Sequence, residues 1–299
     1  MPLLDWLTAL RHNMADDQVL NVAAAARFRG AQPDPERLGL ILRDLKALAT
    51  AAISDGFDYA ALADSQAYHA YRRYVTGLRS FDPGKLSTRK EQLAFWINLY
   101  NGLVLDAVVQ WGVRRSVRDV AGFFWRAAYN LGGLRYSAND IENGVLRANS
   151  HHPAIPGAPF GRSDPRRRYS LDRVDPRVHF ALVCASRSCP AVTVYSPQRV
   201  DEQLDWATRS FIRGGGVEVD PVLGRIRLSR LFQWYAHDFG AKRFAVGDKQ
   251  PLLRFVAGCL DPVDAKLVLA RRRWSVVFSA YDWSLNGAWL GTRTHAASE

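Results

Sequence analysis

The sequence predicts an α+β fold in which an N-terminal layer of helices packs on a small, mostly antiparallel sheet. The first 112 residues carry apolar side chains at helical spacing, and beyond Gly112 shorter elements alternate. The 299-residue chain is 48% hydrophobic and 23% charged, which is the composition of a globular protein. Intrinsically disordered, collagen-like and disulfide-rich classes are therefore excluded.

The N-terminal region reads as a series of amphipathic helices. Residues 1–14 predict one such helix, because apolar residues alternate there with Asp5, Arg11 and His12. The segment lacks the basic start and the cleavage site of a secretory signal. Two longer helices are predicted at Pro35–Ser54 and Tyr59–Leu78. We expect residues 1–56 to be a helical extension and residues 57–299 to form a single α+β domain.

The segment Glu91–Trp111 is apolar nearly all round, which predicts a central helix. Thr88 and Glu91 have the spacing of a capping box and place its start. Asn98 and Asn101 fall in the same sector as Glu91, and buried amides must be hydrogen-bonded. They either pin neighbouring backbone or line a pocket in which an amide positions substrate.

Shorter elements follow Gly112. Leu134–Ser137 predicts a strand, Asn139–Asn149 a short helix, and 150–177 a long surface loop rich in Pro, Gly and Arg. The apolar run Val178–Ala185 predicts a buried strand of the sheet. The remaining predicted elements are a helix at Pro197–Arg213, a hairpin of Val217–Val219 with Arg225–Leu228, helices at Ser229–Phe239 and Gln250–Leu260, and a last strand at Trp274–Tyr281.

The chain is basic, with 40 Lys and Arg against 29 Asp and Glu and a net charge of +11. Much of the excess lies in two clusters, one within 162–177 and one at Arg271–Arg273, but no nucleic-acid-binding motif accompanies them. We therefore expect attraction of an anionic small-molecule or peptide substrate, and no nucleic-acid partner. No uninterrupted apolar run approaches the ~20 residues of a membrane-spanning helix, so no membrane association is expected.

Three cysteines, Cys184, Cys189 and Cys259, are an odd number and too few for a disulfide framework. This count predicts a protein of the reducing cytoplasm. The spacing Cys-x4-Cys is also not the usual spacing of zinc ligands, so neither a metal nor another cofactor is expected.

His179 and Cys189 are the candidate base and nucleophile. Cys189 lies in a polar Ser-Arg-Ser loop beside Arg187, whereas Cys184 lies inside the predicted strand. A thiolate next to a cation is the form that attacks carbonyl carbons. The plain alternative is that each cysteine is a small buried hydrophobic residue.

Carboxylates appear at two further places. Asp140 and Glu142 lie at a predicted helix N-terminus, where one suffices for capping and the other is available to orient a histidine. Asp238 lies at the edge of the apolar face of its helix, while His237 points to solvent. The segment Tyr281–Asn286 follows the last strand, a frequent place for functional residues and for ordinary turns.

Five blocks of the sequence occur together and in order: FWINLYN (95–101), NDIENGVLR (139–147), DPRVHFALVCASRSCP (175–190), LSRLFQWYAHDFG (228–240) and YDWSLN (281–286). In these blocks, from about residue 57 to 286, the chain resembles the domain-of-unknown-function family 547. The resemblance implies a site shared at matching positions: Trp96, Asn98, Asn101, Asp140, Glu142, Arg147, His179, Cys189, Pro190, Trp234, Tyr235, Asp238, Asp282, Trp283 and Asn286. The chain departs from the family pattern at Asn143, where the family often has His, and at Val183, where it often has Asn.

Together these features favour a thiol-dependent hydrolase or acyl/amide transferase. Cys189 attacks a carbonyl, His179 moves the proton, and Asp140 or Glu142 orients the imidazole. The residues assigned to substrate binding are Asn98, Asn101, Arg147, Arg187, Asp238, Asp282 and Asn286, with the two amides as oxyanion donors. The alternative is a non-catalytic protein-interaction module with a buried polar network. Fold-level analogy points to papain-like or transglutaminase-like enzymes, although those place Cys before His.

Overall fold

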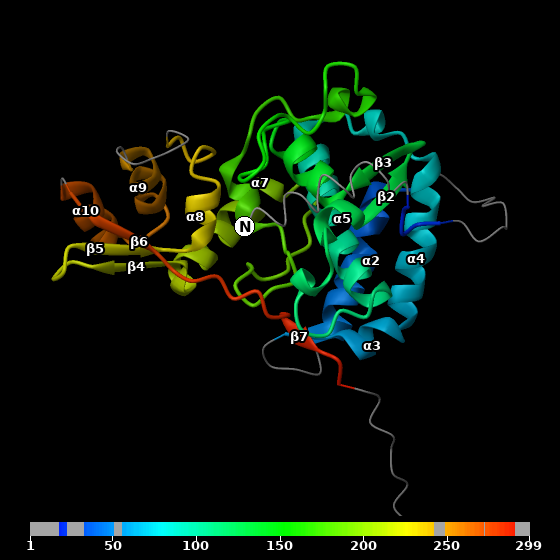
Figure 1. Ribbon diagram of the computed structural model, residues 1–299, viewed down its shortest axis with the longest axis horizontal. Coiled ribbons are helices and arrows are strands. Elements are labelled where there is room, and N and C mark those ends of the chain that lie inside the picture. Colours follow the sequence, from blue (N-terminus) through cyan, green and yellow to red (C-terminus); the bar gives the residue numbers. More distant parts are fainter. Residues whose placement is uncertain (1–17, 23–32, 51–55, 242–248, 272, 291–299) are drawn as a thin grey trace, which may run out of the picture.

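The structure is a computed structural model, and it describes residues 18–22, 33–50, 56–241, 249–271 and 273–290. The helix predicted at residues 1–14 lies outside the described residues. The α+β class is confirmed: helices dominate, and three small sheets accompany them. Figure 1 shows a larger helical body and, on its left, a smaller lobe of helices and strands.

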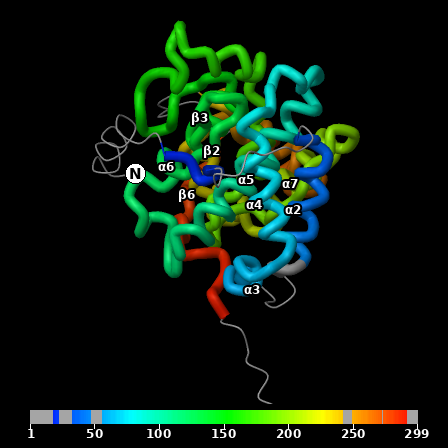
Figure 2. Tube along the Cα trace, turned by 90° about the vertical axis from the view of Figure 1, so that its right-hand side faces the viewer, coloured from blue at the N-terminus to red at the C-terminus, as the bar shows by residue number. Residues whose placement is uncertain are grey.

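The larger body is built around α5 (Arg89–Gln110), whose predicted capping box is present. Thr88 accepts a hydrogen bond from the Glu91 amide, and the Glu91 carboxylate accepts one from the Thr88 amide at 2.8 Å. The helices α2 (Pro35–Thr50) and α4 (Gln66–Gly77) flank α5 and share its hydrophobic core (Figure 2). By length and composition α5 resembles a membrane span, but it is buried inside the fold, as its all-round apolar surface predicts.

The predicted helix Tyr59–Leu78 is divided into α3 (Tyr59–Ala63) and α4, because the side chain of Ser65 caps the second helix. Directly before α3, β1 (Phe57–Asp58) pairs in parallel with β7 (Gly287–Ala288). A β-carbon on Gly287 would lie 2.2 Å from the Phe57 carbonyl oxygen, so only glycine allows this close pairing.

A hairpin of β2 (Ala128–Leu131) and β3 (Leu134–Ser137) lies beside the body and confirms the strand predicted at 134–137. It follows the short helix α6 (Phe123–Arg126). The helix predicted next is a seven-residue π-helix, η4 (Asp140–Leu146), which turns Glu142 and Arg147 inward. The long loop after it contains only a short 3₁₀ turn, η5 (Pro165–Tyr169).

The strand predicted at Val178–Ala185 is wrong. The segment starts as a 3₁₀ turn, η6 (Pro176–Phe180), and continues as irregular buried chain. Asp175 caps the turn, since its carboxylate accepts a hydrogen bond from the Arg177 amide at 3.0 Å. The Asn101 side chain then satisfies the Ala181 carbonyl and the Val183 amide. Side chains therefore supply the hydrogen bonds that a neighbouring strand would have supplied, and burial alone explains the apolar run.

The smaller lobe follows α7 (Val200–Phe211) and the π-turn η7 (Ile212–Gly216). Its sheet has the order β4-β5-β6, with β4 and β5 antiparallel as predicted and β6 parallel to β5. The parallel pair follows from topology, because three helices connect β5 to β6. The elements are β4 (Val217–Asp220), β5 (Arg225–Leu228), α8 (Arg230–Trp234), α9 (Gln250–Ala257), α10 (Pro262–Ala270) and β6 (Ser275–Phe278). The helix α10 was not predicted from the sequence, and the helix predicted at Ser229–Phe239 is longer than the observed α8.

The smaller lobe has a hydrophobic core of its own, which includes Ile226 and Phe232. Phe180 of η6 also belongs to this core, although its chain neighbours Val178 and Ala181 belong to the core of the larger body. The segment around His179 therefore joins the two parts of the molecule.

Candidate functional site

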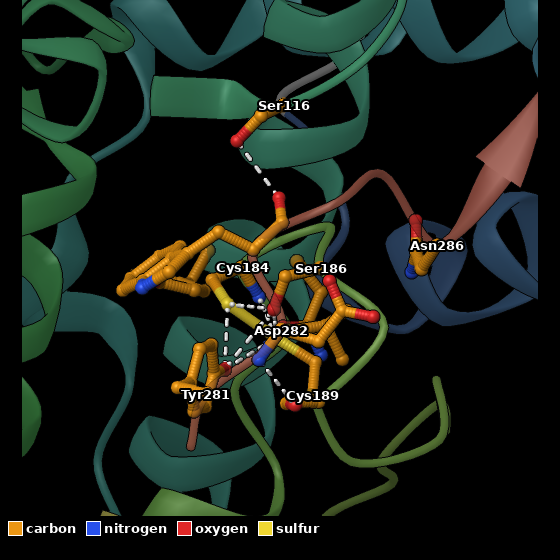
Figure 3. Close-up of a disulfide and its surroundings, with 12 residues drawn as sticks. Ser116, Cys184, Ser186, Cys189, Tyr281, Asp282 and Asn286 are labelled. Carbon is orange, nitrogen blue, oxygen red and sulfur yellow. Dashed lines mark hydrogen bonds between the residues drawn. A yellow bond between two sulfur atoms is a disulfide. The ribbon is translucent and has the colours of Figure 1, made fainter. Parts of the chain in front are cut away.

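Two sulfur atoms form the first part of the site. Cys184 and Cys189 are joined by a disulfide, with their Cα atoms 6.3 Å apart. The low cysteine count predicted free thiols, so this pair corrects that expectation. The hydroxyls of Ser186 and Tyr281 lie 3.1 to 3.3 Å from the sulfur atoms (Figure 3).

The loop that carries the cysteines is fixed by the segment 282–286. The Arg187 amide donates to the Ser284 carbonyl at 2.9 Å, and the Asn286 amide donates to the Ala185 carbonyl at 3.0 Å. Ala185 itself has a positive φ of 59°, a strained conformation for a residue with a side chain. The backbone thus holds the loop in shape by bonds that do not involve sulfur.

Two residues assigned to substrate binding serve this scaffold. The exposed Asp282 carboxylate accepts hydrogen bonds from Ser284. The Asn286 amide oxygen accepts a hydrogen bond from the Tyr59 hydroxyl at 2.7 Å, and Figure 3 shows Asn286 set apart from the sulfur atoms. Neither side chain points to the disulfide.

A cavity of about 380 Å³ lies beside Cys189, where its loop meets α7, η7 and the segment after β6. Arg187 and Tyr281 line it from the site side, and Trp206 lines it from α7. Trp206 is 59% exposed, so an aromatic surface is open to a ligand. The cavity gives small molecules a route to the sulfur of Cys189.

His179 is the centre of the second part of the site. Its Nε2 lies 2.8 Å from an oxygen of Asp238, and its ring stacks on Tyr235 with centroids 3.8 Å apart. Asp238, and not Asp140 or Glu142, therefore orients the imidazole. The prediction named the wrong carboxylates because Asp238 is 59 residues away along the chain.

Burial lowers the pKa of His179 below its ordinary 6.5, and the charge of Arg147 adds to this, while Asp238 opposes it. Burial alone would raise the pKa of Asp238, but hydrogen bonds from His179 and Arg147 outweigh burial and hold that pKa well below its usual range. At neutral pH the imidazole is thus neutral and the carboxylate is ionised. Nε2 then carries the proton toward Asp238, and Nδ1 is the acceptor nitrogen of the ring.

Arg147 is 2% exposed, and its side chain binds other residues of the protein. Its guanidinium contacts both oxygens of Asp238, at 2.6 and 3.0 Å. It also donates to the side chain of Asn143 and to the His151 carbonyl. The expectation that Arg147 binds substrate is corrected, because its donors already have protein partners.

Glu142 and Asp140 occupy separate environments. Glu142 accepts hydrogen bonds from the hydroxyls of Tyr235 at 2.5 Å and Tyr100 at 3.3 Å. Asp140 accepts one from the Ser137 amide at 2.9 Å and pairs with Arg166 at 3.0 Å. Glu142 is therefore the carboxylate that reaches the site, through Tyr235, while Asp140 stabilises the start of η4.

The two asparagines of α5 pin backbone, which is the first of the two alternatives predicted for them. The Asn98 amide donates to the Tyr195 carbonyl and accepts from the Tyr195 amide, at 2.7 and 2.9 Å. Asn101 does the same for Ala181 and Val183. Both amides bind backbone inside the fold and neither lines the cavity beside Cys189, so the predicted role as oxyanion donors is corrected.

In the part of the chain that the structure describes, the hydrogen-bond partners of the Cys189 sulfur are the Cys184 amide, Ser186 and Tyr281. A hydrogen bond between His179 and Cys189 is not among them. Tyr281, which sequence reasoning quoted only as part of a block, lies at the sulfur atoms. Its hydroxyl is 3.3 Å from the Cys189 sulfur and accepts a hydrogen bond from Ser186 at 3.1 Å. Burial raises the pKa of Tyr281 to about 12, so its hydroxyl keeps its proton and acts as a donor.

Acid will destabilise the protein from about pH 6.5 downward, because two half-buried or buried histidines resist protonation. The pKa of His179 is lowered by burial, and burial lowers that of His152 to about 4, whereas both rings titrate near 6.5 in the unfolded chain. The stability they contribute is complete above pH 6.5 and is lost as pH falls through the folded-state values. Urea denaturation between pH 7.5 and 4.5 measures this as a falling free energy of unfolding.

The slope of that pH dependence is the decisive quantity. His179→Gln and His152→Gln should each flatten it, and His237→Gln, at an exposed position, should leave it unchanged. Burial raises the pKa of Asp106, so this residue changes the pH dependence of the free energy of unfolding in the opposite direction. Its contribution is the same in every variant and does not affect the comparison. An unchanged slope in His179→Gln would contradict the neutral, buried imidazole.

Residues 83–212 match a family model described as "Protein of unknown function, DUF547". The matched segment contains α5, His179 and both paired cysteines, and it ends before Asp238 and Tyr281. Neither a curated protein nor a solved structure matches the chain.

Proposed function

We propose that the protein is a thiol-dependent hydrolase or acyl/amide transferase with Cys189 as its nucleophile. Residues 83–212 match the DUF547 family model, and the function of that family is unknown, so the proposal rests on the geometry of the site. One observation carries the proposal. The Cys189 sulfur faces two hydrogen-bond donors at the wall of an open cavity: the Cys184 amide at 2.9 Å and the Tyr281 hydroxyl at 3.3 Å. The Ser186 hydroxyl, which donates to the Tyr281 oxygen at 3.1 Å, also lies 3.3 Å from this sulfur.

Two donors on one sulfur favour its charged form, because each hydrogen bond stabilises the thiolate more than the thiol. Once the bond to Cys184 is reduced, Cys189 is expected to have a pKa below the ~8.5 of an ordinary cysteine. In the proposed mechanism the Tyr281 hydroxyl also donates to the oxygen of the tetrahedral intermediate, in place of Asn98 and Asn101.

In this proposal Cys189 attacks a carbonyl carbon, and His179 accepts and returns the proton through Nδ1. The Asp238 carboxylate supports that role, since it fixes the proton on Nε2 and orients the ring. Tyr281 donates to the sulfur and positions it beside the cavity. The thiol form that the mechanism needs is the form that a reducing cytoplasm maintains.

The cavity suits an anionic or peptide-like small substrate. Arg187 is exposed at its wall next to Cys189 and offers a cation to a carboxylate. Trp206 offers an exposed aromatic surface on the α7 side. A substrate with a carboxylate near the scissile carbonyl and an apolar group beyond it would use both.

The second candidate is the non-catalytic protein-interaction module. It is favoured by the engagement of Arg147, Asn98 and Asn101, whose polar groups are bonded within the fold. In that case the polar network serves only stability, and Cys189 has no reason to be more reactive than another half-buried thiol.

The alkylation rate of Cys189 against pH separates the two candidates. In the Cys184→Ala, Cys259→Ala protein only Cys189 reacts with iodoacetamide, and we expect its rate to titrate at or below pH ~7.5. Tyr281→Phe should raise that midpoint by about one pH unit, since a hydrogen bond to a charged group contributes about 1.5 to 3 kcal/mol.

The matched control is the Cys184→Ala, Cys189→Ala protein, which leaves Cys259 as its only thiol. Burial raises the pKa of Cys259, so its alkylation should titrate above that of Cys189. Equal midpoints for the two thiols would favour the interaction module and contradict the enzyme.

A further inference from the structure

We propose that Cys184 and Cys189 form a reversible redox site, in which peroxide converts Cys189 to a sulfenic acid and Cys184 closes the disulfide seen in the structure. The inference rests on the proposed function in one respect, because it makes the bond an off state of the same nucleophile. It differs from that function in its chemistry, and the two can be tested separately.

The scaffold of the cysteine loop is the first support. Bonds from the segment 282–286 hold Ala185 and Arg187 in place, and the Cys189 amide donates to the Ser186 carbonyl at 3.0 Å. Ser186 and Leu285 also form a β-bridge. None of these contacts needs the sulfur–sulfur bond, so the two sulfur atoms should stay close after reduction. A partner held this close reacts at a high effective concentration.

Accessibility is the second support. Both cysteines are only partly buried, and Cys189 lines the open cavity of about 380 Å³. A small oxidant can therefore reach the Cys189 sulfur, and a small thiol can reach the bond from the same side. Cys259, which lies at the end of α9, has no cysteine partner in the part of the chain that the structure describes.

The local charge is the third support. The Cys184 amide donates to the Cys189 sulfur and stabilises its thiolate, and the cation Arg187 lies two residues before Cys189. The Ser186 and Tyr281 hydroxyls lie near both sulfur atoms, but among the described residues the Cys184 sulfur accepts no hydrogen bond from a backbone amide. Cys189 is thus the sulfur that reacts first, and Cys184 is the sulfur that resolves it.

The chemistry balances with a hydroperoxide and a small thiol as co-reactants. The Cys189 thiolate attacks a peroxide oxygen, the O–O bond breaks, and a sulfenic acid and hydroxide (or an alcohol) form. The Cys184 thiol then displaces the sulfenic hydroxyl, which leaves as water, and the disulfide forms. A dithiol reverses this by exchange: it supplies two electrons and two protons and becomes a disulfide itself.

The proposal is tested on the full chain by counting thiols and trapping sulfenic acid. In native protein reduced with dithiothreitol, all three thiols should titrate; stoichiometric hydrogen peroxide should leave only Cys259, and dithiothreitol should restore the pair. Cys184→Ala should instead accumulate a sulfenic acid on Cys189 that dimedone captures. Cys259→Ala, the matched control, should cycle like the wild type.

Two outcomes would overturn the proposal. A pair that dithiothreitol cannot open without denaturant would be a permanent cross-link. Dimedone capture at Cys189 that is equally strong in the wild type and in Cys184→Ala would show that Cys184 does not resolve it. If the pair opens and closes reversibly but Cys189 is alkylated like an ordinary thiol, the redox site is supported and the hydrolase is contradicted. If Cys189 is reactive but never forms the disulfide again, the hydrolase is supported and the redox site is contradicted.

Discussion

Replacing Arg147 by Met will lower the free energy of unfolding by about 3 to 5 kcal/mol, the usual cost of breaking a buried ion pair by removing one partner. Arg147 and Asp238 have side chains that are 2% and 0% exposed, and the pair is bidentate. Without the guanidinium, His179 is the one side-chain partner left to the buried Asp238 carboxylate among the residues that the structure describes. Urea denaturation at pH 7.5 measures the loss.

The matched control is Arg199→Met. Arg199 also forms a two-bond pair with a carboxylate, Glu202, but both side chains are more than 60% exposed. Its removal should leave the free energy of unfolding nearly unchanged, because water and salt screen an exposed ion pair. If the two variants lose the same free energy of unfolding, the Arg147–Asp238 pair is not shielded from water.

Replacing Cys189 by Ala will lower the rate of acyl transfer from p-nitrophenyl acetate by about 10³-fold or more, because the nucleophile is removed and only binding and polar stabilisation remain. The assay is run with dithiothreitol present, so that the pair is open. Release of nitrophenol gives the rate, and the intact mass of quenched protein shows whether an acetyl group has been added.

The other two cysteines provide the controls. Cys184→Ala and Cys259→Ala should retain acyl transfer, because neither removes the sulfur that faces the cavity. Asp238→Asn should lower the rate while the acetyl group still appears on Cys189, since it changes the orientation of His179 and leaves the nucleophile in place. Acetylation that persists undiminished in Cys189→Ala would place the reactive group elsewhere.

Local signals in the sequence predicted the regular elements well. The capping box at Thr88 and Glu91 placed the start of α5, and the all-round apolar pattern predicted its burial. The same logic failed at Val178–Ala185, where burial is real but the backbone is not extended. An apolar pattern indicates that a segment is buried. It does not show whether a neighbouring strand or a side chain such as Asn101 provides the hydrogen bonds to its backbone.

Cys189 and His179 were named as nucleophile and base, and these roles stay predictions. Asp238 was named only as a substrate-binding residue, and the carboxylates assigned to the imidazole were wrong. Partners separated by 59 residues meet only through tertiary packing, which one sequence does not display. The disulfide was missed because three cysteines, an odd and small number, predicted free thiols in a reducing compartment.

The consecutive placement of His179 and Phe180 has a mechanical consequence. Phe180 packs on Phe211 and Phe232 in the smaller lobe and also lines the cavity, while the imidazole before it is fixed by Asp238. One turn of chain therefore carries both a wall of the cavity and the imidazole, so a ligand that displaces Phe180 will act on the same turn that positions His179.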